Sequence, residues 1–520
     1  MFRFTTQHLV PLSRDRRFLL RLSMGIVVMS VGLAAITSSL RQPGTVLFES
    51  IEWDDLEKLP TSDQGWIELI RFGRTLPLPT PHVDSRMILD EDSNDLILKM
   101  IGDRLETTPI IETYFRGLRR GEPDAAIEEL TEVPALQKHR SEFLGDLHFM
   151  GQDFASALQF YCDEFDAYPE NLYSRRSSVI SAWRIPNRSE MKRLLSDQVT
   201  AKAFEDSERV QLFADARDYG NLAKAVAEFS LRSVFNPATA LPFVISAAIW
   251  FVILTSFWQF DRGRALSSLI AFFLGVASSA TTLFAVLLQE RIYGFELVPE
   301  SSPLSQFIYW VAGVGLREET IKLIFFIPVG VWAARRRSHL EALVLAGIVG
   351  LGFAFGENCI SYREASASSG TWGRFLTANA IHFSLTGIVG FYFTKMVMRK
   401  FHGLEDFLAA FIAVVVVHGL YDAILGMPSL SDYSILMPIF VALVAYRYFD
   451  PLRASLDTYA VHRRISPLGV FVVGSVTLAC IALIATSTTL PLGKSLGVFA
   501  GSIGSLIPLS FAYISRFRDL

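Results

Sequence analysis

Ten apolar stretches constrain the fold of this chain more than any other feature. Nine are long enough for a helix to cross a hydrocarbon core about 30 Å thick, and the stretch Ile435–Tyr448 is short. Backbone groups in lipid must be hydrogen-bonded within the protein, so such stretches fold as helices. A chain of 520 residues with 51% hydrophobic and 19% charged residues fits a polytopic membrane protein. We therefore predict an all-α membrane helix bundle of about ten spans. The other nine predicted spans are Phe18–Leu40, Ala238–Trp258, Leu266–Gln289, Ser305–Ala333, Ala342–Tyr362, Phe375–Met398, Phe407–Leu425, Pro467–Thr486 and Leu496–Ile514.

The distribution of Lys and Arg predicts the orientation of these spans, because positive residues collect in cytoplasmic loops. Ten alternating spans with residues 1–17 inside give every inside loop more basic residues than the short outside loops beside it. We predict a multi-pass protein of the cell (inner) membrane with both termini cytoplasmic, anchored by residues 18–40. A cleaved signal peptide is the alternative for that first segment. Residues 41–236 are predicted to be extracytoplasmic in either case. The basic residues predicted inside are Arg14, Arg16, Arg17, Arg262, Arg264, Arg335, Arg336, Arg337, Lys395, Arg399, Lys400, Arg447, Arg453, Arg463, Arg464, Arg516 and Arg518.

The region 41–236 is polar, and from about residue 110 it has the pattern of short amphipathic helices. Within it, Gly145, Ala157, Tyr161 and Pro169 stand close to the positions that a 34-residue tetratricopeptide repeat requires. We predict a helical, tetratricopeptide-like extracytoplasmic domain over about 110–236, inserted before the later spans. Such repeats bind peptides or protein partners, and an ordinary helical domain is the alternative.

Four consecutive predicted spans carry ionisable residues that a bilayer tolerates poorly. Such residues usually face a cavity or a partner and mark function. Lys322 follows Glu318 by four residues and Glu319 by three, so it can neutralise either carboxylate on one helix surface. A buried ion pair that only fixes helix packing is the alternative for this motif. The next three spans contribute Glu357 and Asn358, then His382, then His418 and Asp422.

Helix geometry predicts that these groups converge. At about 1.5 Å per residue, His382 and His418 both lie on the order of 12 Å below the outer surface, with Glu318 somewhat deeper. Two histidines with carboxylates can hold a divalent metal that activates water, with His382, His418 and Asp422 as candidate ligands. Alternatively, a carboxylate acts as general base and the histidines stabilise the oxyanion. Both schemes are hydrolytic.

The same residues resemble the motifs of the PrsW family of intramembrane proteases, which is distantly similar to the CAAX prenyl endopeptidases of the ABI superfamily. The resemblance covers about 303–425 and rests on four motifs in order. They are E-E-x-x-K (Glu318, Glu319, Lys322), G-F-A-x-x-E-N with a following Tyr362 (Gly352 to Asn358), H-x-x-x-T-G (His382 to Gly387) and H-G-x-x-D (His418 to Asp422).

The resemblance implies an intramembrane endopeptidase, metal- or glutamate-dependent, that cleaves a membrane-anchored regulator of the anti-sigma type near the outer face. It implies that Glu318 or Glu319 acts as acid/base, with Glu357, His382 and His418 completing the catalytic set. Lys322, Asn358 and Asp422 are then supporting residues, and Zn²⁺ is the implied cofactor. The predicted catalytic core is 303–426, preceded by two spans in 237–302 and followed by three spans and a cytoplasmic tail in 427–520.

Two other functions fit the polar spans. An ion-coupled transporter relays protons through such clusters, but it predicts inverted repeats, which are not visible between the two halves of the chain. A receptor or scaffold would bind a partner through the soluble domain and use the charges only to fix the bundle. The sequence has no Gly-rich phosphate loop or basic, aromatic-studded stripe, so we predict no nucleic-acid partner.

Overall fold

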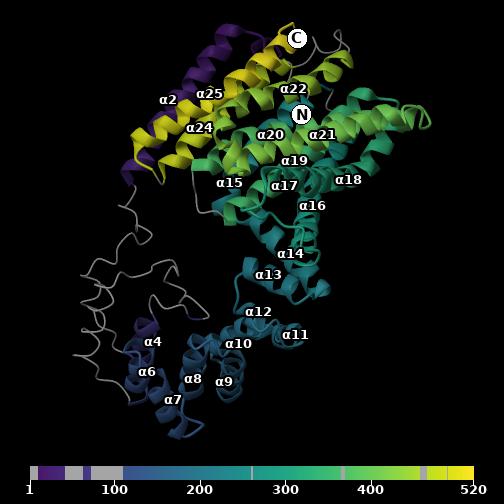
Figure 1. The fold of residues 1–520 in the computed structure, drawn as a ribbon. Helices are drawn as coiled ribbons and strands as arrows, with labels where there is room; N and C mark the ends of the chain where they lie inside the picture. Colours follow the sequence, from purple (N-terminus) through teal and green to yellow (C-terminus); the bar gives the residue numbers. More distant parts are fainter. Residues whose placement is uncertain are drawn as a thin grey trace. The chain divides into compact units, whose positions relative to one another are not determined.

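The computed structural model describes residues 10–40, 62–71, 76, 109–258, 262–364, 369–456, 465–488 and 490–519. Throughout these ranges the secondary structure is helical, with no β-strand, which confirms the predicted all-α class (Figure 1). Parts of the sequence predictions lie outside the described ranges: residues 41–61, most of 72–108, Arg463 and Arg464, and the side chain of Tyr362. The chain divides into two compact units, Met1–Gly44 with Val226–Leu520, and Thr45–Ala225.

Eight helical segments of the described chain are long and apolar enough to cross a membrane, and a ninth is counted if a bent helix pair forms one span. The bent pair is α14 (Tyr219–Phe235) with α15 (Pro237–Thr255), at an angle of 79°. The protein is therefore a multi-pass membrane protein. Two of the ten spans predicted from the sequence are not among these eight: Ala238–Trp258, which overlaps the bent pair, and Ser305–Ala333, which carries Arg317, Glu318, Glu319 and Lys322. The eight are α2 (Arg16–Leu40), α16 (Arg262–Arg291), α19 (His339–Glu364), α20 (Ser369–Met398), α21 (Leu404–Gly426), η2 with α22 (Pro428–Ala454), α24 (Pro467–Ser487) and α25 (Leu492–Phe517).

The charged stretch forms one continuous helical segment in three parts. It runs through α17 (Pro303–Ile308), the π-helix η1 (Tyr309–Gly315) and α18 (Leu316–Arg335). Ser302 caps its start by accepting a hydrogen bond from the Ser305 amide, and Pro303 occupies the first helical position, where no amide donor is needed. π-Helical turns are rare and are often found at functional sites, and this one ends three residues before Glu318.

Helix α19 is the centre of the membrane unit, because 94% of its apolar window is buried by protein. Helices α15, α16, α18 and α20 pack around it, and α21 packs on η1, α18 and α20. Helices α2, α24 and α25 lie side by side at one flank of the bundle, in purple and yellow (Figure 1). A helix enclosed on all sides by other helices positions its polar residues without exposing them to lipid.

The second unit is a succession of short helices, each packed on the next along the chain. Its hydrophobic core joins Trp66, Ile67 and Ile70 to the helices that follow. Gly145 packs directly against Tyr161, since a Cβ added at Gly145 would lie 2.6 Å from the Tyr161 ring. This is a small-residue contact of the kind that repeats require, and the tetratricopeptide assignment remains a prediction. Its helices are α4 (Asp63–Arg71), α6 (Pro109–Arg119), α7 (Pro123–Glu132), α8 (Arg140–Met150), α9 (Phe154–Ala167), α10 (Leu172–Arg184), α11 (Arg188–Ser196), α12 (Gln198–Lys202) and α13 (Asp206–Asp215).

A buried ion network ties this unit together. The guanidinium of Arg71 lies 2.6 Å from Glu142 Oε1 and 2.7 Å from Asp146 Oδ2. Burial by itself would raise the pKa of Glu142, but the Arg71 charge and hydrogen bonds from His139 and Asn171 lower it to about 2. Arg71 stands 71 residues before Glu142, so the network joins α4 to α8 by a long-range contact.

Candidate active site

The first two turns of α18 carry the carboxylates and their counter-charge. Lys322 is fully buried, and its Nζ donates to Glu319 Oε1 at 2.9 Å and to Glu318 Oε2 at 3.2 Å. The ring of Phe353 lies 3.8 Å from the same nitrogen, a cation–π contact. A charge removed from water this completely needs such partners, since an unpaired buried ion costs several kcal/mol. Lys322 therefore compensates both carboxylates at once.

His418, from α21, completes the contacts of these carboxylates. Its Nδ1 lies 2.8 Å from Glu319 Oε1, and its Nε2 lies 3.4 Å from Glu318 Oε2 and 3.3 Å from Asp422 Oδ2. The Nδ1 contact is the short one, so Glu319 fixes the orientation of the imidazole. The other ring nitrogen, Nε2, therefore faces Glu318 and Asp422.

His382, from α20, links the cluster to α19. Its Nδ1 lies 3.0 Å from Lys322 Nζ, and its Nε2 lies 3.0 Å from Glu357 Oε2. The His382 and His418 rings are 5.2 Å apart between centroids. Glu357 is the most accessible member, with 24% of its side chain exposed. Four helices thus contribute ionisable groups that touch one another inside the bundle.

Close glycine contacts hold these four helices in register. A Cβ at Gly419 would lie 2.5 Å from Val311 Cα, and one at Gly315 would lie 2.5 Å from the Val415 carbonyl oxygen, so α21 and η1 meet backbone to backbone. A Cβ at Gly350 would lie 2.4 Å from the carbonyl oxygen of His382. Each contact adjoins the cluster in sequence, since Gly419 follows His418. Only glycine permits so close an approach, which brings short polar side chains from neighbouring helices within hydrogen-bonding reach.

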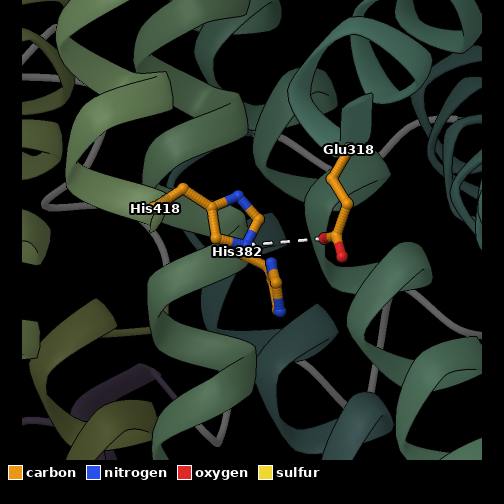
Figure 2. Close-up of side chains that lie close together, drawn as sticks. All are labelled: Glu318, His382 and His418. Atoms are coloured by element: carbon orange, nitrogen blue, oxygen red, sulfur yellow. Dashed lines mark ion pairs between the residues drawn. The ribbon is translucent and has the colours of Figure 1, made fainter. Parts of the chain in front are cut away.

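The donor set fits a divalent metal. Ligand atoms of Glu318, His382 and His418 all lie within 4.8 Å of one another, and Figure 2 shows the two imidazoles and the carboxylate converging. Two imidazoles and a carboxylate are a ligand set that zinc takes in hydrolytic sites. The Glu319 contact to His418 Nδ1 is the outer-shell hydrogen bond that metal-binding histidines usually make. Asp422, a predicted ligand, contacts His418 but is not among these three.

Lys322 sets one condition on metal binding by His382. An ammonium has no lone pair, so in this arrangement Lys322 donates to His382 Nδ1. The neutral imidazole then carries its proton on Nε2, the nitrogen beside Glu357. A protonated nitrogen cannot bind a metal. His382 therefore becomes a ligand through Nε2 only when its contact with Lys322 is broken.

The structure brings together seven of the eight predicted site residues: Glu318, Glu319, Lys322, Glu357, His382, His418 and Asp422. Asn358 is buried on the same turn as Glu357, and its Nδ2 has no hydrogen-bond partner in the part of the chain described. Arg317, which precedes Glu318, donates to Gln289 Oε1 on α16 at 2.7 Å. Phe353 stands in the G-F-A-x-x-E-N motif, but its contacts with Lys322 and His382 were not foreseen, because a motif letter does not say which way a side chain faces.

Fold and site together define an α-helical membrane protein with a buried carboxylate–histidine centre. Residues 264–446 match the PrsW family of intramembrane metalloproteases, which confirms the resemblance seen in the sequence motifs. The match runs from α16 into α22 and includes every residue of the cluster, and it supports an intramembrane protease. No curated protein and no solved structure matches the chain.

Proposed function

We propose that this protein is an endopeptidase that hydrolyses a peptide bond of a membrane-anchored protein near the outer face of the membrane. The observation that carries the proposal is the contact cluster of Glu318, Glu319, His382 and His418, buried inside the helix bundle. A purely structural ion pair needs only Lys322 and one carboxylate. Helix α21 brings the His418 imidazole to both carboxylates, and α20 brings His382 to Lys322 and Glu357, which is an arrangement suited to moving protons.

Distinct roles follow from the contacts. Glu319 already accepts from Lys322 and contacts His418, so it is the group that positions the imidazole. Glu318 makes longer contacts and has 9% of its side chain exposed, so it is the better general base for a water molecule. That water attacks the peptide carbonyl, the C–N bond breaks, and the proton taken up by Glu318 passes to the leaving amine. His418 and His382 are placed to stabilise the charge on the carbonyl oxygen.

Glu318, His382 and His418 are the residues that would hold a divalent metal, with Asp422 beside them. The family description supports metal use, and we propose Zn²⁺ because its preferred ligands are those present here. A bound zinc ion supplies a Lewis acid and lowers the pKa of water to near neutrality. Whichever species activates the water, Glu319 keeps the His418 ring oriented.

The proposed topology has both termini in the cytoplasm and residues 41–236 outside, with the Thr45–Ala225 unit recruiting or sensing a substrate or partner. The substrate class we propose is a membrane-anchored regulator of the anti-sigma type. The alternation of loops rich and poor in basic residues supports the proposed topology. In a variant with Cys162, Cys359 and Cys480 replaced by Ser, single cysteines placed in the Thr45–Ala225 unit should react with a membrane-impermeant maleimide in intact spheroplasts. Cysteines at position 337 or 516 of the same variant should react only after lysis.

The test of the activity compares membrane-protein fragments from cells that produce the wild type, Glu318→Gln or His418→Ala at equal abundance. At least one membrane-anchored protein should yield a fragment cut near its outer end with the wild type and not with the variants. Glu341→Gln is the matched control, since Glu341 is also buried but pairs with Arg264, away from the cluster. If the variants lower the abundance of the protein in the membrane and no fragment disappears, the charged residues have a structural role only.

A further inference from the structure

Two helices of the Thr45–Ala225 unit bring a histidine and two carboxylates together. We propose that His139, Glu142 and Glu164 form a second divalent-metal site, suited to zinc, that joins the start of α8 to the last turn of α9. Ligand atoms of the three residues all lie within 4.8 Å of one another. The site does not depend on the proposed protease function. A bound ion would make the stability of this unit depend on the concentration of free zinc.

The contact between His139 and Glu142 already has the spacing of two metal ligands. His139 Nδ1 lies 3.2 Å from Glu142 Oε2. Two ligands of a tetrahedral zinc ion, each bonded at about 2.0–2.2 Å, lie about 3.3 Å apart. Metal ligands must be deprotonated, so the ion would take the place of the proton that the hydrogen bond between this nitrogen and this oxygen requires.

Glu164 is held beside this pair by the backbone at the start of α8. Its Oε1 accepts from the His139 amide at 2.8 Å, and its Oε2 accepts from the Glu142 amide at 3.3 Å. An ionised carboxylate offers about four lone-pair sites, so both hydrogen bonds can persist when a metal binds. The third ligand is therefore in position before an ion arrives, and coordination needs only a small movement of its side chain.

The buried charges of this region do not balance without a further cation. The carboxylates of Glu142, Asp146 and Glu164 are at most 2% exposed. Arg71 pairs with the first two, and Glu164 has no lysine or arginine partner among the residues that the structure describes. Burial and the nearby charge of Glu142 raise the pKa of Glu164, which shows that its negative charge is poorly compensated. With His139 neutral, three carboxylates against one guanidinium leave two negative charges, which one divalent ion neutralises.

A cavity beside His139 connects the site with solvent. It has a volume of about 410 Å³ and is lined by His139, by the neighbouring Lys138 and by Asp63 and Gln64 at the start of α4. The His139 side chain is 18% exposed, whereas that of Glu142 is 3% exposed. An ion can therefore enter from the His139 side, and a water molecule can fill the fourth position that three protein ligands leave open.

A second histidine–carboxylate pair in the same unit provides a contrast. His148 Nδ1 lies 3.2 Å from Asp153 Oδ2, the same separation as in the proposed site. The side chains of this pair are 22% and 49% exposed, and within the described ranges no third ligand joins them. A hydrogen-bonded pair alone does not form a metal site, so His148 supplies a matched control.

The experiment counts ions in the full-length protein after loading with Zn²⁺ and removal of excess metal by gel filtration. His139→Ala and Glu164→Gln should each hold about one Zn²⁺ per chain fewer than the wild type, and His148→Ala should hold as many as the wild type. His418→Ala should lose any zinc of the membrane cluster and keep the ion at His139. The two sites are therefore counted separately.

The outcomes decide between a metal site and a hydrogen-bonded cap of α8. Equal zinc content in the wild type, His139→Ala and Glu164→Gln overturns the site and leaves the protease proposal intact. A His418→Ala protein without zinc also overturns it, and so does an equal loss of zinc in His148→Ala, which would indicate surface binding.

Hydrogen exchange of the wild type tests the joint between α8 and α9 without any substitution. The amides of His139 and Glu142 donate to Glu164, so added Zn²⁺ should slow their exchange by about tenfold or more. His139→Ala should show no such effect of zinc. Exchange in the wild type that zinc does not change would overturn the proposed site.

Discussion

The backbone contact between α21 and η1 gives the sharpest prediction, because it turns one added carbon atom into a measurable loss of activity. In Gly419→Ala the new Cβ would lie 2.5 Å from Val311 Cα and 2.8 Å from the Trp310 carbonyl oxygen. Ordinary carbon contacts begin at about 3.4 Å, so the two helices must separate by about 1 Å. Both obstructing atoms belong to backbone, so no side-chain rotation relieves them.

This separation acts directly on the active site, since His418 precedes Gly419. The contact from His418 Nδ1 to Glu319 Oε1 would lengthen from 2.8 Å to about 3.8 Å, beyond hydrogen-bonding distance. A misplacement of about 1 Å can lower the rate of an enzyme on the order of 100-fold. Overpacking itself costs about 1–3 kcal/mol, so the variant should still fold.

The assay follows cleavage of the anchored substrate in nanodiscs, together with membrane abundance and melting temperature. Gly501→Ala on α25 is the matched control, because a Cβ there meets nothing within 4 Å. It should retain wild-type cleavage. Gly419→Ala with wild-type cleavage at wild-type abundance would refute the argument that this contact sets the active-site geometry.

Three further predictions test other parts of the molecule. Lys322→Met leaves Glu318 and Glu319 without their shared cation and should destabilise the protein by about 3–5 kcal/mol, seen as a lower melting temperature; Lys395→Met, at an exposed pair, should cost less than about 1 kcal/mol. Elemental analysis of the purified protein should find about one divalent ion per chain at the active site. A chelator, or the His418→Ala substitution, should remove both this ion and the activity. Retention of activity by the metal-free protein would establish a glutamate-dependent mechanism. The pKa of Glu142 is lower in the folded protein than its ordinary value of 4.5, so the stabilisation it contributes, on the order of 3 kcal/mol, is present above about pH 4.5 and is lost as the pH falls towards about 2; hydrogen exchange of α8 in the full-length protein should rise over that range, and a flat profile would contradict the network.

Sequence reasoning predicted the polar cluster because helix rise converts residue number into depth. Glu318, His382 and His418 fall at overlapping depths in adjacent spans, and the structure places their ligand atoms within 4.8 Å of one another. Depth says nothing about rotation around each helix axis. The contact of Arg317 with Gln289 depends on that rotation, and so does the contact of Phe353 with Lys322.

The π-helix and the glycine contacts were not predictable from pattern, because both depend on how two backbones meet. The sequence shows Gly315 and Gly419 a hundred residues apart, with nothing to indicate that each faces the other helix. The Arg71 network was hidden in the same way, since a lone arginine in a polar segment looks like any solvated charge. Local sequence specifies helices well and specifies the contacts between distant helices poorly.

The division of the active site among α18, α19, α20 and α21 has a consequence for biosynthesis. Glu318 is inserted into the membrane long before His418 has been translated, about 100 residues later. At about 5–20 residues per second, the nascent chain holds its carboxylates without their histidine partner for roughly 5–20 s. During that interval Lys322 is the only cation on the same helix that the carboxylates contact, and a truncated chain has no complete catalytic group. A ribosome that stalls before α21 therefore leaves a chain without His418, and under the proposed function proteolysis would begin only when synthesis of the bundle is nearly complete.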